Sequence, residues 1–442
     1  MKLPVKLIHF LLPLTLLLTA CGSAAKPETR HLTAAFEEPW YDWESTPQET
    51  IVIWGDQYDM ARNYIKRAFE RYEELTGSRL EVVSLSQIEY EESVRQAILG
   101  NIEKPDVLLS YGGTNIEAFN PDENFYDFSE AVWVKDLTPT SINQTIYHGK
   151  VIGLAHSESS ISGMLYNKKL FKKLGIETPG NQEEFLNACR ILKENGITPV
   201  YLPYKEITML LYQFPMDTIL EDPAILAGLN DGTLSYADIP EMKEIAKWYR
   251  NMADLGYFGE DYLENNWAGM DIAMAGEQYG MMICWDTWLY TNFTGNAADF
   301  GLMPAFMGVP EEGTFEGPNQ MLFIVNRNSS RLDAALNFIT FLADPYNYNV
   351  VFEGIYTAPV FKNQEASIST PQYAESERLI EEHFRDSTAW LRVRGFSQMD
   401  AICIQKYMTA EPGYTVEDCL KEMDRLRAER LAFANSRNGT GR

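Results

Sequence analysis

Two tryptophans flank a carboxylate directly after a short apolar run in the middle of the chain. Residues 280–284 have the composition of a β-strand, and Trp285, Asp286 and Trp288 follow them. An indole offers a flat apolar face for stacking, and a carboxylate accepts hydrogen bonds from hydroxyl groups. Together they suit a guest with an apolar ring face and a hydroxylated edge, as sugars have. The alternative is that both tryptophans anchor a core beside the strand.

Motifs of nucleophilic, metal-dependent and nucleotide-dependent catalysis are missing from the sequence. It contains no H-E-x-x-H, no G-x-S-x-G, no P-loop and no G-x-G-x-x-G after a strand. The five histidines are scattered and form no pair at helical spacing. Acidic residues are abundant, so counting does not exclude a glycosidase pair, but no two acids stand out as one. We expect a binding protein that is not an enzyme, with no cofactor and no metal site.

The first residues have the pattern of an exported lipoprotein. A basic start precedes an apolar run at 7–18, which is too short to cross a bilayer as a mature helix. The letters L-T-A-C at 18–21 resemble the bacterial lipobox. This resemblance implies a signal peptide at 1–20 and lipidation of Cys21, with a diacylglyceryl thioether on its sulfur and an acyl chain such as palmitate on its amine. An ordinary signal peptide with an incidental cysteine is the alternative.

Residues 21–47 have no sustained periodicity and are rich in Ala, Pro, Glu, Thr and Ser, so we expect a flexible tether. The cluster Trp40-Tyr41-Asp42-Trp43 interrupts it. Two interpretations stay open, because the cluster could dock on the folded body or touch a membrane partner.

Composition predicts a large, acidic body. With 45% hydrophobic and 12% aromatic residues the chain can bury a sizeable core, and its length calls for two lobes rather than one. The formal net charge of −26 would repel phosphates, so we expect no nucleic-acid partner. Cys189, Cys284, Cys403 and Cys419 lack C-x-x-C spacing, and buried free thiols are expected. A Cys403–Cys419 disulfide is the less favoured alternative.

Strands and helices alternate after the tether. Strand patterns at 50–54, 80–85 and 106–111 are separated by helical patterns, which is typical of a parallel α/β sheet. Ligands bind such sheets at the carboxyl ends of the strands. Four candidate ligand contacts lie at those ends, namely Trp54, Asp56, Gln57 and Tyr111. Asp56 could instead cap the following helix, and Trp54 could pack against the strand.

The segment "GKVIGL…MLYNKKLFKKLGIETPGNQEEFLNACRILKENGITPV" closely resembles the bacterial extracellular solute-binding proteins of family 1, the sugar-binding lipoproteins of the maltose-binding-protein type. Further stretches fit the family in the same order: the strand at Ile51, "PDVLLSYGG", "MAGEQYGMMICWDTW", "DFGLMPAF", "AALNFITFLADP" and "GYTVEDCLKEMDRL". The likeness covers residues 48 to 435.

The resemblance implies an α/β periplasmic-binding-protein type II fold, in which hinges join two lobes around a ligand cleft. Lobe one would take residues 48–155 plus 304–350, and lobe two residues 156–303 plus 351–435. The chain would cross between lobes near 154–155, 302–304 and Gly354. Closure of the lobes around ligand would signal to the transporter.

Site residues carried over by position come from both lobes. Lobe one would supply Trp54, Asp56, Gln57 and Tyr111. Ser160 stands where maltose-binding protein has an acid, and Glu158 lies two residues earlier. Lobe two would supply Tyr204, Trp285, Asp286 and Trp288. A structural role is favoured for five weaker candidates: Trp267, Asn319, Gln320, Trp390 and Phe396.

The resemblance and the aromatic residues together predict the function. We expect a monomeric lipoprotein on the extracytoplasmic face of the cell membrane, which captures a mono- or oligosaccharide and delivers it to the permease of an ABC importer. The alternative is a lipid-anchored glycan-binding or glycan-degrading surface protein that is not coupled to a transporter.

Overall fold

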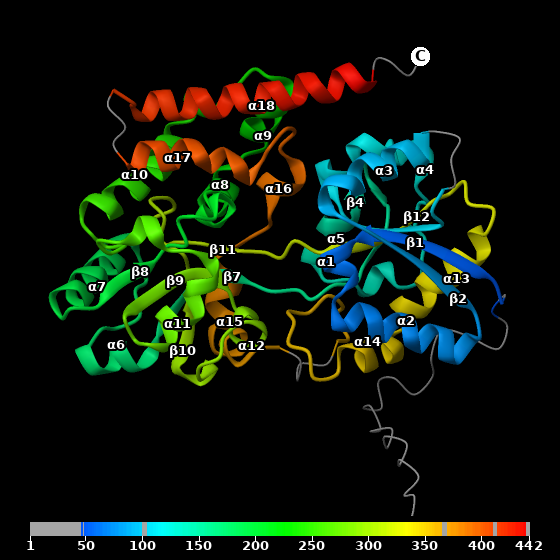
Figure 1. The fold of residues 1–442 in the computed structure, drawn as a ribbon, viewed down its shortest axis with the longest axis horizontal. Coiled ribbons are helices and arrows are strands. Elements are labelled where there is room, and N and C mark those ends of the chain that lie inside the picture. The colour runs from blue at the N-terminus through cyan, green and yellow to red at the C-terminus, as the bar shows by residue number, and fades with distance from the viewer. Residues whose placement is uncertain (1–45, 47, 100–103, 365–368, 410–412, 439–442) are drawn as a thin grey trace, which may run out of the picture. The chain divides into compact units, whose positions relative to one another are not determined.

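The computed structural model describes residues 46, 48–99, 104–364, 369–409 and 413–438 (Figure 1). The expected signal peptide, the lipidation site Cys21 and the Trp40–Trp43 cluster lie outside these residues. In this part of the chain, no helix is both long enough and apolar enough to span a membrane.

The first lobe is built on a five-stranded sheet with the order β2-β1-β3-β12-β6. Strand β1 runs parallel to both β2 and β3, whereas β12 is antiparallel to β3 and to β6. The strands are β1 (Thr50–Asp56), β2 (Arg79–Leu85), β3 (Val107–Tyr111), β6 (Leu154–Ala155) and β12 (Met321–Val325). The helices are α1 (Gln57–Met60), α2 (Asn63–Thr76), α3 (Gln87–Leu99), α4 (Pro121–Asn124), α5 (Pro139–Thr145), α13 (Leu332–Ala343) and α14 (Pro345–Phe352), with the 3-10 helix η3 (Gly113–Phe119) and the hairpin β4 (Ile146–Tyr147) and β5 (Lys150–Val151).

The apolar stripe of α2 explains how this lobe is held together. Ile65, Ala68 and Tyr72 recur at helical spacing and are fully buried against the sheet and α13. Tyr72 packs edge-on against Phe338 of α13, with ring centroids 4.9 Å apart. Gly77 ends the helix in the left-handed conformation, at φ 71°.

The second lobe has a six-stranded sheet with the order β13-β11-β7-β9-β8, and β10 also pairs with β7. The strands are β7 (Ser162–Asn167), β8 (Thr198–Tyr201), β9 (Tyr279–Trp285), β10 (Phe300–Met303), β11 (Phe315–Glu316) and β13 (Phe384–Arg385). The helices are α6 (Lys168–Leu174), α7 (Gln182–Glu194), α8 (Gln213–Ile219), α9 (Pro223–Asp231), α10 (Pro240–Asp254), α11 (Met270–Ala275), α12 (Trp288–Thr291), α15 (Pro371–His383), α16 (Thr388–Arg392), α17 (Ala401–Met408) and α18 (Val416–Asn438). Figure 1 shows α18 lying along α17.

Local sequence signals set the ends of the second lobe's elements. Asn167 caps α6 by accepting hydrogen bonds from the amides of Lys169 and Leu170, and Gly175 ends this helix at φ 67°.

Cys403 and Cys419 are buried free thiols, so the less favoured disulfide between them is absent.

The expected two-lobed α/β fold is confirmed, but the chain changes lobes at different points. Residues 304–316 belong to the second lobe, because Ala305 pairs with Thr314 and Glu316 pairs with Ser162 of β7. The second crossing therefore lies at 317–320 instead of near 302–304. Val360 and Phe361 pack in the core of the first lobe, which extends beyond the expected boundary at residue 350.

Candidate functional site

A cavity of about 240 Å³ is lined by both lobes and by two of the segments that connect them. The first lobe contributes Arg62, Tyr64, Tyr111 and Met321. The second contributes Ser162, Leu211, Gln213, Phe214, Trp285, Glu316 and Gln398. The connecting segments add Ser157, Glu158, Ser160, Gly317, Pro318 and Asn319. Hydroxyl, amide, carboxyl and guanidinium groups therefore share the lining with aromatic and aliphatic side chains, which suits a polar guest with an apolar face.

The ends of strands bring several of these side chains together. Tyr111 is the last residue of β3, and Trp285 is the last residue of β9. Arg62 directly precedes α2. The cavity thus lies where strands of both sheets end, as expected for α/β folds.

Trp285 forms one wall of the cavity and is supported from behind. Its indole stacks on that of Trp267, with ring centroids 5.2 Å apart and an angle of 23° between the planes. Trp267 in turn packs edge-on against the buried Trp288, at 6.5 Å. This aromatic group fixes the orientation of Trp285, so its ring is pre-positioned before a ligand arrives.

Charged groups lie at the first-lobe side of the cavity. Arg62 lies 3.7 Å from Glu158 and 3.7 Å from Asp59. Burial raises the pKa of Asp59 to about 6, although Arg62 opposes that shift. Tyr64 hydrogen-bonds to the backbone of Glu158, and burial raises the pKa of its hydroxyl. The hydroxyl of Tyr64 therefore stays neutral at physiological pH.

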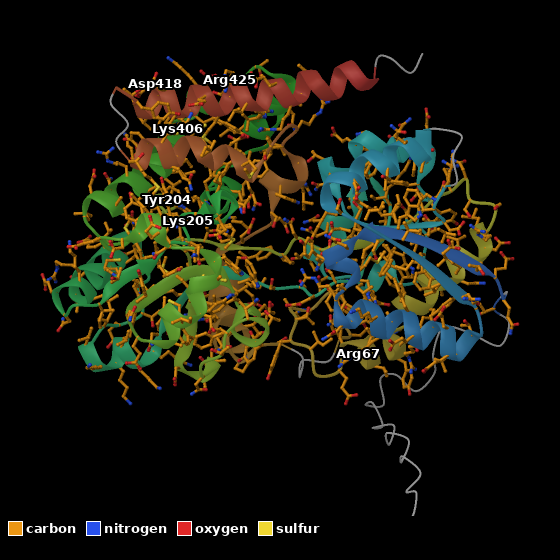
Figure 2. All side chains as sticks on the ribbon, in the orientation of Figure 1. Arg67, Tyr204, Lys205, Lys406, Asp418 and Arg425 are labelled. Atoms are coloured by element: carbon orange, nitrogen blue, oxygen red, sulfur yellow. The ribbon has the colours of Figure 1, made fainter. Side chains whose placement is uncertain are left out.

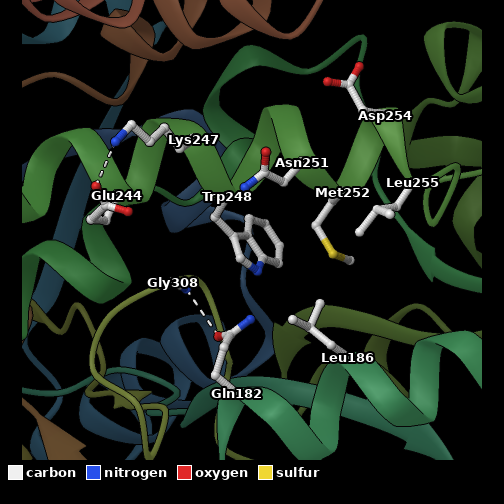
Figure 3. A pocket seen from close by; sticks show the side chains of 10 residues that line it. All are labelled: Gln182, Leu186, Glu244, Lys247, Trp248, Asn251, Met252, Asp254, Leu255 and Gly308. Carbon is white, nitrogen blue, oxygen red and sulfur yellow. Dashed lines mark hydrogen bonds and ion pairs between the residues drawn. The ribbon is translucent and has the colours of Figure 1, made fainter.

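A larger cavity of about 400 Å³ lies elsewhere, on the second lobe alone. Figure 3 shows Trp248 pointing from α10 into this space, toward Gln182 of α7, which accepts a hydrogen bond from the amide of Gly308. Because the first lobe contributes nothing to its lining, this cavity does not have the arrangement expected for capture between lobes. The smaller interlobe cavity is the better candidate despite its size.

Comparison with known proteins identifies the family. The sequence profile described as bacterial extracellular solute-binding protein matches residues 67–379. The chain belongs to this family. One curated relative is the melibiose/raffinose/stachyose-binding protein MelE of Bacillus subtilis (strain 168), which is 26% identical over 169 residues. That match covers 36% of this chain and only 38% of MelE.

Solved structures of two-lobed binding proteins share the fold of this solute-binding protein. The binding protein MsmE of Bacillus subtilis, in an open conformation, superposes with a TM-score of 0.74 at 18% identity, covering 87% of this chain and 98% of the other. A sugar transporter protein of Bacillus licheniformis in complex with stachyose gives a TM-score of 0.65 at 18% identity, covering 85% and 98%. At such identities the likeness shows the fold alone.

Three of the nine expected ligand contacts of this family member line the cavity: Tyr111, Glu158 and Trp285. Trp54 packs against the first-lobe core, and Gln57 is exposed at the start of α1. Asp56 caps α1 by accepting a hydrogen bond from the amide of Tyr58 (2.8 Å), which is the structural alternative considered for it. These three residues shortly precede the lining residue Arg62 in the sequence, but they are not part of the cavity lining themselves.

The other three expected contacts are held inside the second lobe. Asp286 is fully buried and accepts hydrogen bonds from the amide of Ile161 (2.9 Å) and the hydroxyl of Thr370. Trp288 is 1% exposed and packs in the core. Tyr204 lies beside Lys205 in the second lobe (Figure 2), edge-on to Tyr262 at 5.4 Å. For these residues the structure shows packing roles.

Sequence reasoning missed several lining residues, among them Arg62, Tyr64, Gln213, Phe214 and Glu316. Gln213 and Phe214 lie at the start of α8, which no strand-end argument reaches. Glu316 ends a two-residue strand that is too short to show a pattern. Asn319, which was a weaker candidate, does line the cavity.

Proposed function

We propose that this protein captures a mono- or oligosaccharide in the interlobe cavity and delivers it to the permease of an ABC importer. In this proposal it acts as a monomer on the extracytoplasmic face of the membrane, anchored through a lipid on Cys21, and performs no catalysis. The observation that carries the proposal is Trp285, an indole that stacks on Trp267 at the wall of a cavity whose lining also supplies hydroxyl, amide and charged groups.

The polar lining and the relatives support a sugar over other solutes. Sugar rings stack an apolar face on aromatic side chains while their hydroxyls exchange hydrogen bonds with amides and carboxyls. Asn319, Gln213 and Ser160 supply such groups around the indole. MelE is named for binding melibiose, raffinose and stachyose, and a structure of the same fold holds stachyose. These sugars are therefore the first probes.

The test is calorimetric titration of the purified protein with melibiose, raffinose, stachyose and maltose, with a dipeptide as a solute of another class. We expect saturable binding of at least one sugar and none of the dipeptide. Trp285→Ala should weaken that binding roughly 5- to 150-fold, because a stacked aromatic ring contributes about 1 to 3 kcal/mol by its buried area.

The matched control is Tyr204→Phe, which alters an aromatic side chain outside the cavity and should bind like the wild type. Absence of binding to every sugar, or unchanged affinity in Trp285→Ala, would contradict the proposal. Chromatography of the sugars after incubation distinguishes a binding protein from a glycan-degrading surface protein, because only the latter would give shortened products.

A further inference from the structure

A second cavity adjoins the interlobe cavity. Its volume is about 220 Å³, and Arg62, Tyr64 and Glu158 line both cavities. The rest of its lining comes from the start of α2, from α12 of the second lobe, and from residues 354–356, which follow α14 of the first lobe. The adjoining chamber, as we call it, therefore lies between the same two lobes as the interlobe cavity.

Two tyrosines from different lobes form an aromatic surface in the adjoining chamber. Tyr290 of α12 and Tyr356 have ring centroids 4.1 Å apart, and their planes are inclined by 39°. The hydroxyl of Tyr290 donates a hydrogen bond to Gln372 (2.8 Å), which fixes the position of that ring. Both tyrosines are half-buried, so part of their surface is open to a ligand. Such a surface suits the apolar face of a sugar ring.

The loop that carries Tyr356 is tied to the first lobe. Arg67 of α2 donates hydrogen bonds to the carbonyl oxygens of Val351 (3.3 Å) and Glu353 (2.8 Å), just before the loop. Tyr356 is therefore presented from an anchored segment, and its contact with Tyr290 joins the first lobe to the second. A ring held in this way is positioned before a ligand arrives, which lowers the entropic cost of binding.

An ion pair stands where the two cavities meet. Arg62 lies 3.7 Å from Glu158, and both side chains line both cavities. A guanidinium only donates hydrogen bonds and a carboxylate only accepts them, whereas a sugar hydroxyl can do either. A ligand that reached from one cavity into the other would pass this pair, which could bind hydroxyls on both sides of the boundary.

The interlobe cavity is equipped to hold one ring by itself. Trp285 supplies a face for stacking, and the side-chain oxygens of Gln213 and Asn319 are buried without a hydrogen-bond partner within the described part of the chain. Buried acceptors without partners cost free energy, which ligand hydroxyls would recover. Each cavity alone is smaller than the range of about 300 to 1,000 Å³ that is typical of ligand pockets. A ligand of several rings therefore needs both.

We propose that the adjoining chamber is a second sugar subsite, and that the ligand is an oligosaccharide of at least two rings. One ring stacks on Trp285 in the interlobe cavity, and the next lies against Tyr356 and Tyr290. Arg62 and Glu158 bind hydroxyls on either side of the linkage between them. The inference rests on the proposed function and deepens it, because it names the length of the ligand and the residues that select it.

The test compares sugars of increasing length by titration calorimetry. The probes are galactose, melibiose and raffinose in one series, and glucose, maltose and maltotriose in the other. In the series that binds, the disaccharide should bind the wild type at least about fivefold more tightly than the monosaccharide, because a second ring is buried. Tyr356→Ala should weaken disaccharide binding roughly 5- to 50-fold and leave monosaccharide binding within about twofold.

Three variants separate a ligand contact from a structural effect. Tyr356→Phe keeps the ring and should restore wild-type affinity for the disaccharide. Tyr346→Ala removes a half-buried tyrosine of α14 outside both cavities and should bind like the wild type. Trp285→Ala should weaken monosaccharides and disaccharides alike, since its ring belongs to the interlobe cavity.

Three results would overturn the second subsite and leave the proposed function standing. These are a disaccharide that binds no better than its monosaccharide, unchanged disaccharide affinity in Tyr356→Ala, and an equal loss of affinity for both sugars in that variant. The last result would show that Tyr356 acts on the arrangement of the lobes. Failure of every sugar to bind the wild type would instead contradict the proposed function, and the second subsite with it.

Discussion

Trp285 and Asp286 are neighbours in the sequence, but only Trp285 lines the cavity. Successive residues of a strand point to opposite faces, so if Trp285 lines the cavity, Asp286 must point away from it. Asp286 meets the amide of Ile161 and the hydroxyl of Thr370 and becomes a structural contact. The sequence allowed the indole to be predicted from its place at a strand end. It did not reveal which of Trp285, Asp286 and Trp288 lines the cavity.

The support that Trp267 gives to Trp285 leads to a prediction for ligand affinity. Trp267→Leu removes the ring stacked at 5.2 Å and leaves the cavity lining intact. An aromatic pair contributes about 0.5 to 1.5 kcal/mol beyond area burial, so sugar affinity should fall roughly 2- to 10-fold. Titration calorimetry measures the change. Tyr58→Leu, at a side chain that is 72% exposed, is the control and should bind normally.

His156 gives a prediction for acid stability. It is fully buried among Phe323, Tyr348 and Phe352, and burial lowers its pKa to about 3. The unfolded state binds a proton below about pH 6.5 and the folded state does not, so stability is lost as pH falls below that value. The loss should reach roughly 2 kcal/mol at about pH 5.

Urea unfolding of His156→Phe should therefore show a smaller loss of unfolding free energy between about pH 7 and about pH 5 than the wild type. His383→Phe serves as the control, because it removes a different histidine and leaves the buried imidazole of His156 in place. Equal losses in the wild type and His156→Phe would show that His156 is not the group responsible.

At the level of elements, η3 of the first lobe packs against α16 of the second. The hydroxyl of Thr114 donates to the carbonyl of Trp390 (3.2 Å), and Arg394 lies 3.4 Å from Glu117. Gly113 has φ 65°, and a Cβ added there would lie 2.1 Å from the carbonyl oxygen of Leu391. Only glycine allows this approach, so the residue fixes a contact between the lobes.

Gly113→Ala should lower the free energy of unfolding by at least about 1 kcal/mol more than Gly149→Ala. Gly149 has a similar φ of 79° with nothing within 4 Å of an added Cβ, so that variant carries the backbone strain without the clash. Urea denaturation of both proteins measures the difference. Equal destabilisation by the two substitutions would show that η3 and α16 can move apart to accommodate the added methyl group without a loss of unfolding free energy.

Long elements with clear periodicity could be predicted from the sequence, and short ones could not. The stripe of α2 shows a helical period, and the strands β1, β3 and β9 carry nearly continuous apolar runs of strand length. Strand β11 has two residues and pairs with β7, which lies far away in sequence. Because β11 belongs to the second sheet, the chain crosses between the lobes at 317–320. A pairing between strands so distant in sequence leaves no local pattern from which this crossing could be predicted.

For the whole molecule, the proposed lipid on Cys21 predicts where the protein is found. In a bacterial host, Cys21→Ala should prevent acylation and release the protein from the membrane fraction, since membrane retention requires acyl chains. Metabolic labelling with a palmitate analogue and fractionation of the cells measure this. Retention of unlabelled Cys21→Ala on the membrane would show that another segment holds it there, and Cys189→Ala should behave like the wild type.

The order of strands in the first sheet has a consequence for how the protein is made. Strand β12 lies between β3 and β6, although more than half of the chain is synthesised between the first strand of this sheet and β12. The sheet stays split, with two unpaired edges, until that late segment arrives, and contacts so distant in sequence form slowly. The first lobe therefore completes its sheet only after most strands of the second sheet have been synthesised.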